Sequence, residues 1–162
     1  MKTPAKPPIK PVVTICSSVS FYRQAIDVKA QLEALGVTVV VPLVALKMQE
    51  SGDFEVSHYK TWFADENDYG KKAELMRTHF DKVAAGDATL VLNYEKHGHK
   101  NYIGANVLME MSLAFYLKQP IFVINELPAD SPFEEELKGM APTLLRGDIT
   151  LLPALLAKLP TA

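Results

Sequence analysis

The chain has 162 residues, of which 48% are hydrophobic, and this favours one domain whose core needs no disulfide bonds. Its formal net charge of -2 gives no overall attraction to nucleic acid or to an anionic membrane, and no apolar run approaches the ~18 residues that span a bilayer. The single cysteine, Cys16, excludes an internal disulfide and fits a reducing cytoplasm, where we expect the protein.

The first eleven residues are basic and rich in proline, and we interpret them as a flexible lead-in. Their charge suits the start of a signal peptide, but their prolines do not, so we predict no signal peptide. Residues 12–162 are expected to form a single α/β domain.

Strands and helices alternate along this domain. The β-branched run 12–16 predicts the first strand, and apolar residues at three- and four-residue spacing predict a helix over 21–35. The same criteria predict strands over 37–41, 88–93 and 120–125, and helices over 71–85, 104–117, 133–140 and 153–159. Either 143–145 or 149–152 is expected to add an edge strand.

The strand runs are continuously apolar, as in strands that are buried on both faces. Together with the alternation they predict a doubly wound, flavodoxin-like parallel sheet of four to five strands with helices on both faces. Residues 43–69 lack a clear pattern, and we expect a lid or some short irregular helix there. Tyr59 and Trp62 in this segment could stack on a flat base or simply anchor the loop.

Polar side chains follow three of the predicted strands, at the edge where open α/β sheets bind ligands. Cys16, Ser17 and Ser18 follow the first strand, whereas Asn93 and Asn125 end two later ones. The serine loop opens a helix, whose free N–H groups favour an anion such as phosphate, although a serine there is also a common helix cap. The loop has neither the Walker nor the dinucleotide-binding pattern.

Glu110 is a carboxylate inside an otherwise apolar helix. Its neighbours Met109, Met111 and Leu113 make an ionised acid costly unless it is paired or used. In a purely structural role, Glu110 would pair with a lysine or lie at the solvent-exposed edge of an amphipathic helix. Helical side chains point toward the N-terminal end, which aims Glu110 at the crevice, and we predict a functional acid.

The histidines give weaker signals. His79 lies in the middle of a helix, where a structural role is the more common one. His97 and His99 share a loop with Lys96 and Lys100, but no other nearby cysteine or histidine completes a metal site. We therefore predict no metal and interpret this loop as solvated and able to contact an acidic ligand.

Four segments of the chain resemble the nucleoside 2-deoxyribosyltransferase superfamily, which includes the deoxynucleoside 5′-monophosphate N-glycosidases. The first is the opening strand with its Cys-Ser-Ser loop (12–18), and the second is the Gly-Asp-Ala-Thr-Leu-Val-Leu-Asn strand (86–93). The third is the glycine loop that leads to a helical glutamate (102–110), and the fourth is the Ala-Phe-Tyr-Leu-Lys-Gln-Pro-Ile run (114–121). The resemblance implies that Glu110 attacks the anomeric carbon of a sugar and expels the base. It also implies no cofactor and a homodimer or larger homo-oligomer.

Substrate contacts are expected from the strand-end residues and from those that match the superfamily: Cys16, Ser17, Ser18, Tyr22, Asn93, Tyr102, Gly104, Asn106 and Asn125. Two positions depart from the superfamily pattern. Its acid near the base falls on His79, which could replace that acid in catalysis if it is protonated. Its serine or aspartate six residues before the nucleophile is Gly104 here, with Asn106 as the nearest polar side chain.

These residues predict an N-glycosidase or N-glycosyltransferase that cleaves the base–sugar bond of a nucleoside or a nucleoside 5′-monophosphate. The expected partner is this small molecule and not a nucleic acid polymer. One alternative is a module that binds a nucleotide without cleaving it, which the missing acids favour. Another is NAD glycohydrolysis, as in TIR-type domains, which also place a glutamate beside a flavodoxin-like sheet. A purely structural partner protein ranks lowest.

Overall fold

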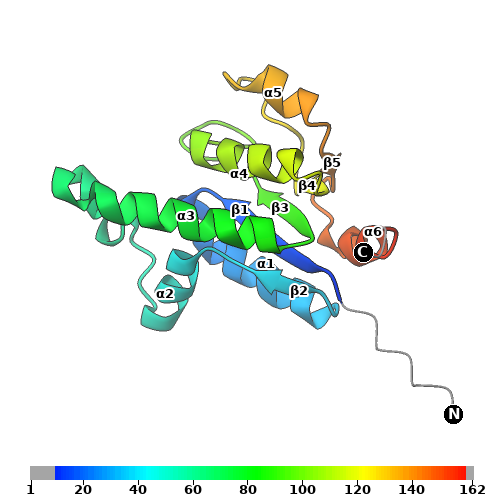
Figure 1. The fold of residues 1–162 in the computed structure, drawn as a ribbon, viewed down its shortest axis with the longest axis horizontal. Coiled ribbons are helices and arrows are strands. Elements are labelled where there is room, and N and C mark those ends of the chain that lie inside the picture. Colours follow the sequence, from blue (N-terminus) through cyan, green and yellow to red (C-terminus); the bar gives the residue numbers. More distant parts are fainter. Residues whose placement is uncertain (1–9, 160–162) are drawn as a thin grey trace, which may run out of the picture.

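Five parallel strands form one sheet in the order β2-β1-β3-β4-β5. The computed structural model describes residues 10–159, so most of the predicted lead-in lies outside the described residues. The strands are β1 (Val12–Ser17), β2 (Thr38–Val40), β3 (Ala88–Leu92), β4 (Ile121–Val123) and β5 (Thr143–Leu144). This order confirms the predicted flavodoxin-like fold class (Figure 1).

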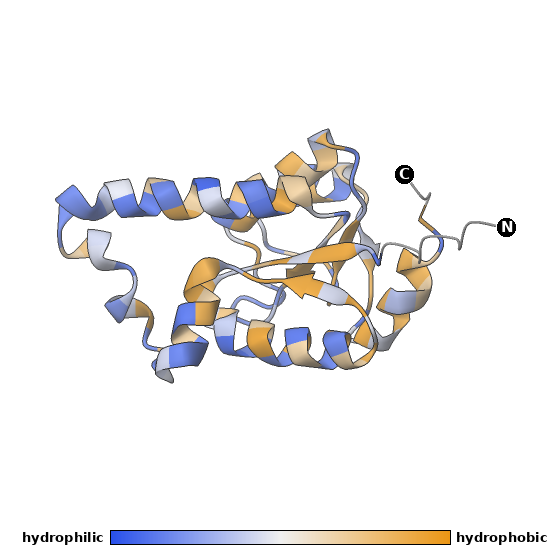
Figure 2. Cartoon of the chain, turned by 60° about the horizontal axis from the view of Figure 1, so that its bottom comes forward, coloured by the Kyte–Doolittle hydropathy of each residue, from blue (hydrophilic) through white to orange (hydrophobic). Residues whose placement is uncertain are grey.

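Helices cover both faces of the sheet. They are α1 (Tyr22–Ala34), α2 (Leu43–Ser51), α3 (Tyr69–Ala85), α4 (Ala105–Tyr116), α5 (Glu134–Gly139) and α6 (Leu152–Leu156). Residues of α1 and α6 share one apolar cluster, and residues of α3, α4 and α5 share the other. Figure 2 shows the apolar strands between two layers of helices that carry hydrophilic residues. Within residues 10–159, no helix is both long and apolar enough to cross a membrane.

The pleat of each strand divides its side chains between these two clusters. In β1, Val13 and Ile15 pack in the cluster with Leu32 of α1, whereas Cys16 packs in the cluster with Met111 of α4. Both sets are almost fully buried. Alternate side chains therefore meet a helix layer on either face, which explains the uninterrupted apolar runs in the sequence.

The segment between β2 and α3 is more ordered than the sequence indicates. It holds the regular helix α2, which begins after Pro42 and ends at Gly52 in a left-handed conformation with φ of 70°. Three 3-10 turns follow, namely η2 (Val56–His58), η3 (Thr61–Phe63) and η4 (Glu66–Asp68). They lie around the N-terminal part of α3, which projects beyond the sheet in Figure 1.

The edge strand is β5, and the alternative segment forms the 3-10 turn η5 (Ile149–Leu151). β5 pairs in parallel with β4 at the edge of the sheet next to α5 and α6. The opposite part of the sheet, around β1 and β3, carries the functional candidates. Because β1 and β3 are neighbours and parallel, their carboxyl ends open on the same side.

Candidate active site

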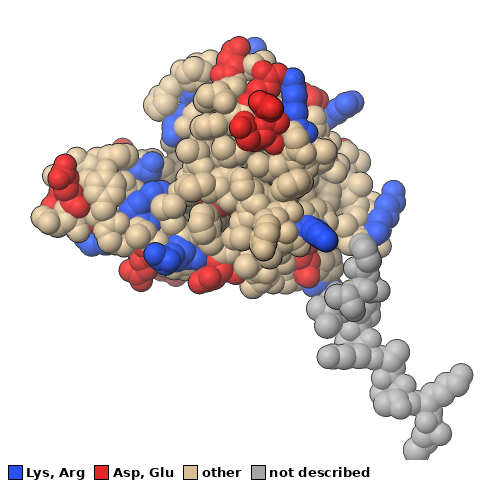
Figure 3. Space-filling view, turned by 45° about the horizontal axis from the view of Figure 1, so that its top comes forward, with Lys and Arg blue, Asp and Glu red and all other residues tan. Residues whose placement is uncertain are grey.

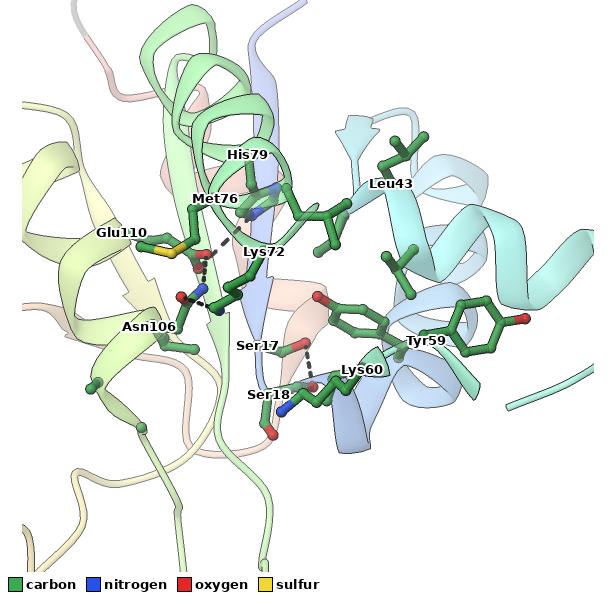
Figure 4. Close-up of a pocket in the computed structure, with 18 of the residues that line it drawn as sticks. Ser17, Ser18, Leu43, Tyr59, Lys60, Lys72, Met76, His79, Asn106 and Glu110 are labelled. Atoms are coloured by element: carbon green, nitrogen blue, oxygen red, sulfur yellow. Dashed lines mark hydrogen bonds and ion pairs between the residues drawn. The ribbon is translucent and has the colours of Figure 1, made fainter. Parts of the chain in front are cut away.

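A cavity lies where the loops after β1 and β3 meet α2, α3, α4 and the 3-10 turns (Figure 4). Its polar lining includes Ser17 at the end of β1 and, from the two loops, Ser18, Lys96 and Tyr102. Of the carboxylates in the described residues, Glu110 alone contributes to this lining. The cavity thus combines one acid with several hydroxyl and amine groups, which is the composition of a site for an anionic, hydroxylated molecule.

The Glu110 carboxylate is held by a short chain of hydrogen bonds that crosses from α3 to α4. Asn106 Nδ2 donates to Glu110 Oε1 over 3.0 Å, and Lys72 Nζ donates to Asn106 Oδ1 over 2.8 Å. Asn106 lies one helical turn before Glu110, so the helix itself sets their spacing. The hydrogen bond from Asn106 orients the carboxylate through Oε1. The other oxygen, Oε2, is buried and has no hydrogen-bond partner.

The surroundings of Glu110 favour its protonated form near neutral pH. The side chain is 3% exposed, and burial raises the pKa of its carboxyl to about 7. The neighbouring Cys16 thiol, the charge of Lys72 and the hydrogen bond from Asn106 lower this pKa, but they offset the burial only in part. An acid in this range changes its charge near physiological pH, as many catalytic carboxyl groups do.

Cys16 and His79 lie against Glu110 at the inner end of the cavity. His79 Nε2 is 3.5 Å from Cys16 Sγ and 3.9 Å from Glu110 Oε2. Ligand atoms of the three side chains all lie within 4.8 Å of one another. No local pattern predicts this cluster, because its three residues lie far apart in the chain, whereas His97 and His99, which suggest a metal pair at first sight, are exposed.

His79 does not meet the condition for a protonated acid. Burial and, to a smaller extent, the charge of Lys82 lower the pKa of its imidazole to about 4, and a backbone contact with Ile15 opposes this shift only in part. The ring is therefore neutral at neutral pH. This weighs against the hypothesis that a charged His79 acts as a catalytic acid, and it leaves the histidine as a neutral neighbour of the carboxylate.

Three lysines from different elements converge on the cavity: Lys60 before η3, Lys72 in α3 and Lys96 after β3. Partial burial lowers the pKa of each amine, and the charge of Lys60 lowers those of the other two as well. Figure 3 shows positive side chains gathered at the base of the projecting part of the molecule. Such mutual repulsion is relieved by a bound anion.

The serine loop faces this cationic part of the cavity. Ser18 is the N-cap residue of the 3-10 turn η1 (Val19–Phe21), but its hydroxyl makes no capping bond and accepts from Lys96 Nζ over 3.0 Å. The Lys96 amine also lies 4.9 Å from the centre of the Tyr102 ring. The hydrogen bonds therefore do not support a helix-capping role for Ser18. Its hydroxyl and the Lys96 amine are instead placed so that both could contact one anion.

Tyr102 explains the glycine at position 104. A Cβ at Gly104 would lie 2.8 Å from the Tyr102 hydroxyl oxygen, closer than real Cβ contacts allow. The phenol thus occupies the space where a serine or aspartate side chain would begin. Tyr22 adds a second phenol to the lining, and burial raises its pKa, so it stays a hydrogen-bond donor.

Asn93 and Asn125 do not line the cavity, contrary to the predicted substrate contact. Asn93 Oδ1 accepts from the Asn125 backbone over 3.0 Å, and its Nδ2 donates to the Glu126 carbonyl over 2.7 Å. Asn125 in turn donates to the Asn93 carbonyl over 3.1 Å. These bonds tie the ends of β3 and β4 together, so both amides have structural roles.

Of the other predicted contacts, Ser17, Ser18, Tyr22, Tyr102, Gly104 and Asn106 line the cavity, and Cys16 lies behind Glu110 and His79. Lys60 and Lys72 also line the cavity and were not predicted from the sequence. For Lys72 a signal existed, since Lys72, Met76 and His79 recur at helical spacing and share one face of α3. Lys60 carries no such pattern. Tyr59 and Trp62 also line the cavity, where Trp62 is buried.

No protein-family model matches this chain, and a search of curated proteins finds no match.

Proposed function

We propose that the protein is an N-glycosidase or N-glycosyltransferase that acts on a nucleoside 5′-monophosphate, with Glu110 as the nucleophile. The observation that carries this proposal is the buried Glu110 carboxylate, whose Oε2 has no partner and which faces a cavity lined by three lysines and two serines. The carboxylate suits attack on a sugar carbon, whereas the lysines suit a phosphate.

In the proposed reaction a Glu110 oxygen forms a bond to the anomeric carbon as the carbon–nitrogen bond to the base breaks. The base leaves with the electron pair and takes a proton from a donor or from water. Water, or a second base, then displaces Glu110 and restores the carboxylate. Asn106 and Lys72 hold the nucleophile in place. Ser18, Lys60 and Lys96 all line the cavity and would take the phosphate; Figure 4 shows Ser18 next to Lys60, and Lys96 donates to Ser18.

The test is chromatographic detection of free base. The purified chain would be incubated with nucleosides, nucleoside 5′-monophosphates and NAD in metal-free buffer. Base release from monophosphates supports the proposal, and release from NAD alone would favour NAD glycohydrolysis instead. Tight binding without any release would favour the second candidate, a nucleotide-binding module. That candidate is supported by the absence of a second carboxylate from the described lining of the cavity.

A phosphate subsite predicts a selective defect when Lys96 is replaced. Lys96→Met should raise the KM for a nucleoside monophosphate by about tenfold or more, because a hydrogen bond to a charged group contributes roughly 1.5–3 kcal/mol. The KM for the matching nucleoside should change much less. Steady-state kinetics on both substrates measure this ratio. Lys47→Met, at an exposed position of α2 outside this cavity, is the matched control, and an equal loss on both substrates would contradict the phosphate assignment.

The rate should rise with pH through about 7, since the nucleophile must be ionised and burial raises the Glu110 pKa to about 7. The substrate phosphate also titrates, with a pKa of about 6. Asn106→Leu separates the two groups, because loss of the bond to Glu110 Oε1 should move the midpoint of kcat/KM to higher pH. Ser112→Ala, an exposed change in the same helix, should leave it unmoved. An unchanged midpoint in Asn106→Leu would assign the titration to another group.

A further inference from the structure

Cys16, His79 and Glu110 bring a sulfur, a nitrogen and an oxygen together from three different elements. They belong to β1, α3 and α4, and all three side chains are buried. The distance from Cys16 Sγ to His79 Nε2 is 3.5 Å. Tetrahedral zinc, with bonds of about 2.3 Å to sulfur and about 2.0 Å to nitrogen, separates two such ligand atoms by about 3.5 Å. The pair is therefore already spaced for one metal ion.

The third ligand is close to the required position. His79 Nε2 lies 3.9 Å from Glu110 Oε2. Two ligands at about 2.0 Å from a tetrahedral centre lie about 3.3 Å apart, so the carboxylate would have to approach His79 by roughly half an ångström. The carboxylate also lies within 4.8 Å of Cys16 Sγ and would have to close on the sulfur when a metal binds. Oε2 is buried and has no hydrogen-bond partner, whereas Oε1 is held by Asn106. An unpaired buried carboxylate oxygen aimed at a thiol and an imidazole points to a missing positive partner.

We propose that the protein binds one zinc-like divalent cation through Cys16 Sγ, His79 Nε2 and the Glu110 carboxylate. Mixed sulfur, nitrogen and oxygen ligands suit zinc better than magnesium or calcium, which prefer oxygen alone. Three protein ligands leave a fourth position. His79 and Glu110 line the cavity, so this position opens toward it and can hold water.

The charges of the site balance when the metal is bound. Burial keeps the Cys16 thiol protonated in the metal-free protein, because it raises the pKa of that group. Binding replaces the thiol proton, and any proton on Glu110, and releases them to solvent. A thiolate and a carboxylate then neutralise the doubly charged ion in the buried site. Lys72 and Lys82 are the nearby positive charges that oppose binding.

The consequence for activity rests on the proposed function. A cation bound to Glu110 would hold the oxygen that attacks the sugar. Zinc should therefore inhibit base release, and a chelator should restore it. Metal binding itself does not depend on catalysis and is measured separately.

The test uses Co²⁺ as a spectroscopic substitute for Zn²⁺ on the metal-free full chain. We expect one Co²⁺ per chain, visible bands of tetrahedral cobalt and a thiolate-to-metal charge-transfer band, all lost when Zn²⁺ is added. Cys16→Ser and His79→Gln should each weaken binding by at least about tenfold, because loss of even an outer-shell partner of a metal ligand costs about 10- to 100-fold in affinity. The exposed double change His97→Gln with His99→Gln should leave binding as in the wild type.

The wild-type spectrum decides the proposal even if a variant fails to fold, which circular dichroism would show. Absence of the thiolate band overturns it. So does Co²⁺ binding that disappears in the His97 and His99 double variant, because that would place the ion on the exposed loop. Base release without cobalt binding would leave the proposed function standing, and cobalt binding without base release would leave the metal site standing.

Discussion

Glu110→Gln should reduce base release by about 10³-fold or more, because it removes the nucleophile and leaves only binding and orientation. The change keeps the size of the side chain, and an amide can still accept a hydrogen bond from Asn106 Nδ2. We therefore expect the monophosphate to bind to the variant with an affinity within a few-fold of the wild type. Single-turnover kinetics and a direct binding titration measure these two effects separately.

The matched control for this prediction is Glu126→Gln, which removes an exposed carboxylate paired with Arg146. Its activity should equal that of the wild type, because Glu126 lies outside the lining of the cavity. If Glu110→Gln kept more than about a tenth of the rate, nucleophilic catalysis by this residue would be refuted. A variant that lost binding as well as rate would instead assign Glu110 to substrate recognition.

Glu110→Gln should also make the protein more stable than the wild type at high pH. A buried acid whose pKa rises from its ordinary value of 4.5 to about 7 keeps its proton in the folded state and loses it earlier in the unfolded chain. The folded state therefore binds more protons between these values, and wild-type stability falls as pH rises through that window. The full cost above pH 7 is on the order of 3 kcal/mol, since each pKa unit corresponds to about 1.4 kcal/mol.

Urea unfolding of both proteins in chelated buffer at pH 4 and at pH 8 tests this linkage. The free energy of unfolding of Glu110→Gln minus that of the wild type should increase between the two conditions. The titration of His79 affects both proteins and largely cancels in this difference. Glu126→Gln, at an exposed site, should show no comparable change. A difference that stays constant with pH would mean that burial does not raise the Glu110 pKa in the folded protein.

Local sequence signals found the elements of this fold with small errors at their ends. The predicted strand 12–16 is Val12–Ser17, and the predicted helix 104–117 is Ala105–Tyr116. These signals work because a strand buried on both faces must be apolar throughout, and a helix on the sheet must repeat its apolar face. The helix α2 escaped detection because only Val44, Ala45 and Met48 are buried on it, too few to give a clear period.

The residues that line the cavity were predicted in part. Glu110 stood out because an acid among apolar neighbours is costly wherever the helix packs. Asn93 and Asn125 were also polar at strand ends, and nothing in the local sequence shows that their amides bond to each other and to Glu126. A polar residue at a strand end can close the sheet or face a ligand, and the difference depends on its neighbours in space.

The sequence by itself determined the alternating elements, the parallel sheet and the position of one unusual acid, because each depends on residues within a few turns or one strand. Only the tertiary structure decided what surrounds that acid. Cys16 and His79 are 63 residues apart, and they meet because β1 lies inside the sheet, between β2 and β3, with α3 packed against it. Lys60, Lys72 and Lys96 converge for the same reason, since strand order and helix packing bring together side chains that no local pattern connects.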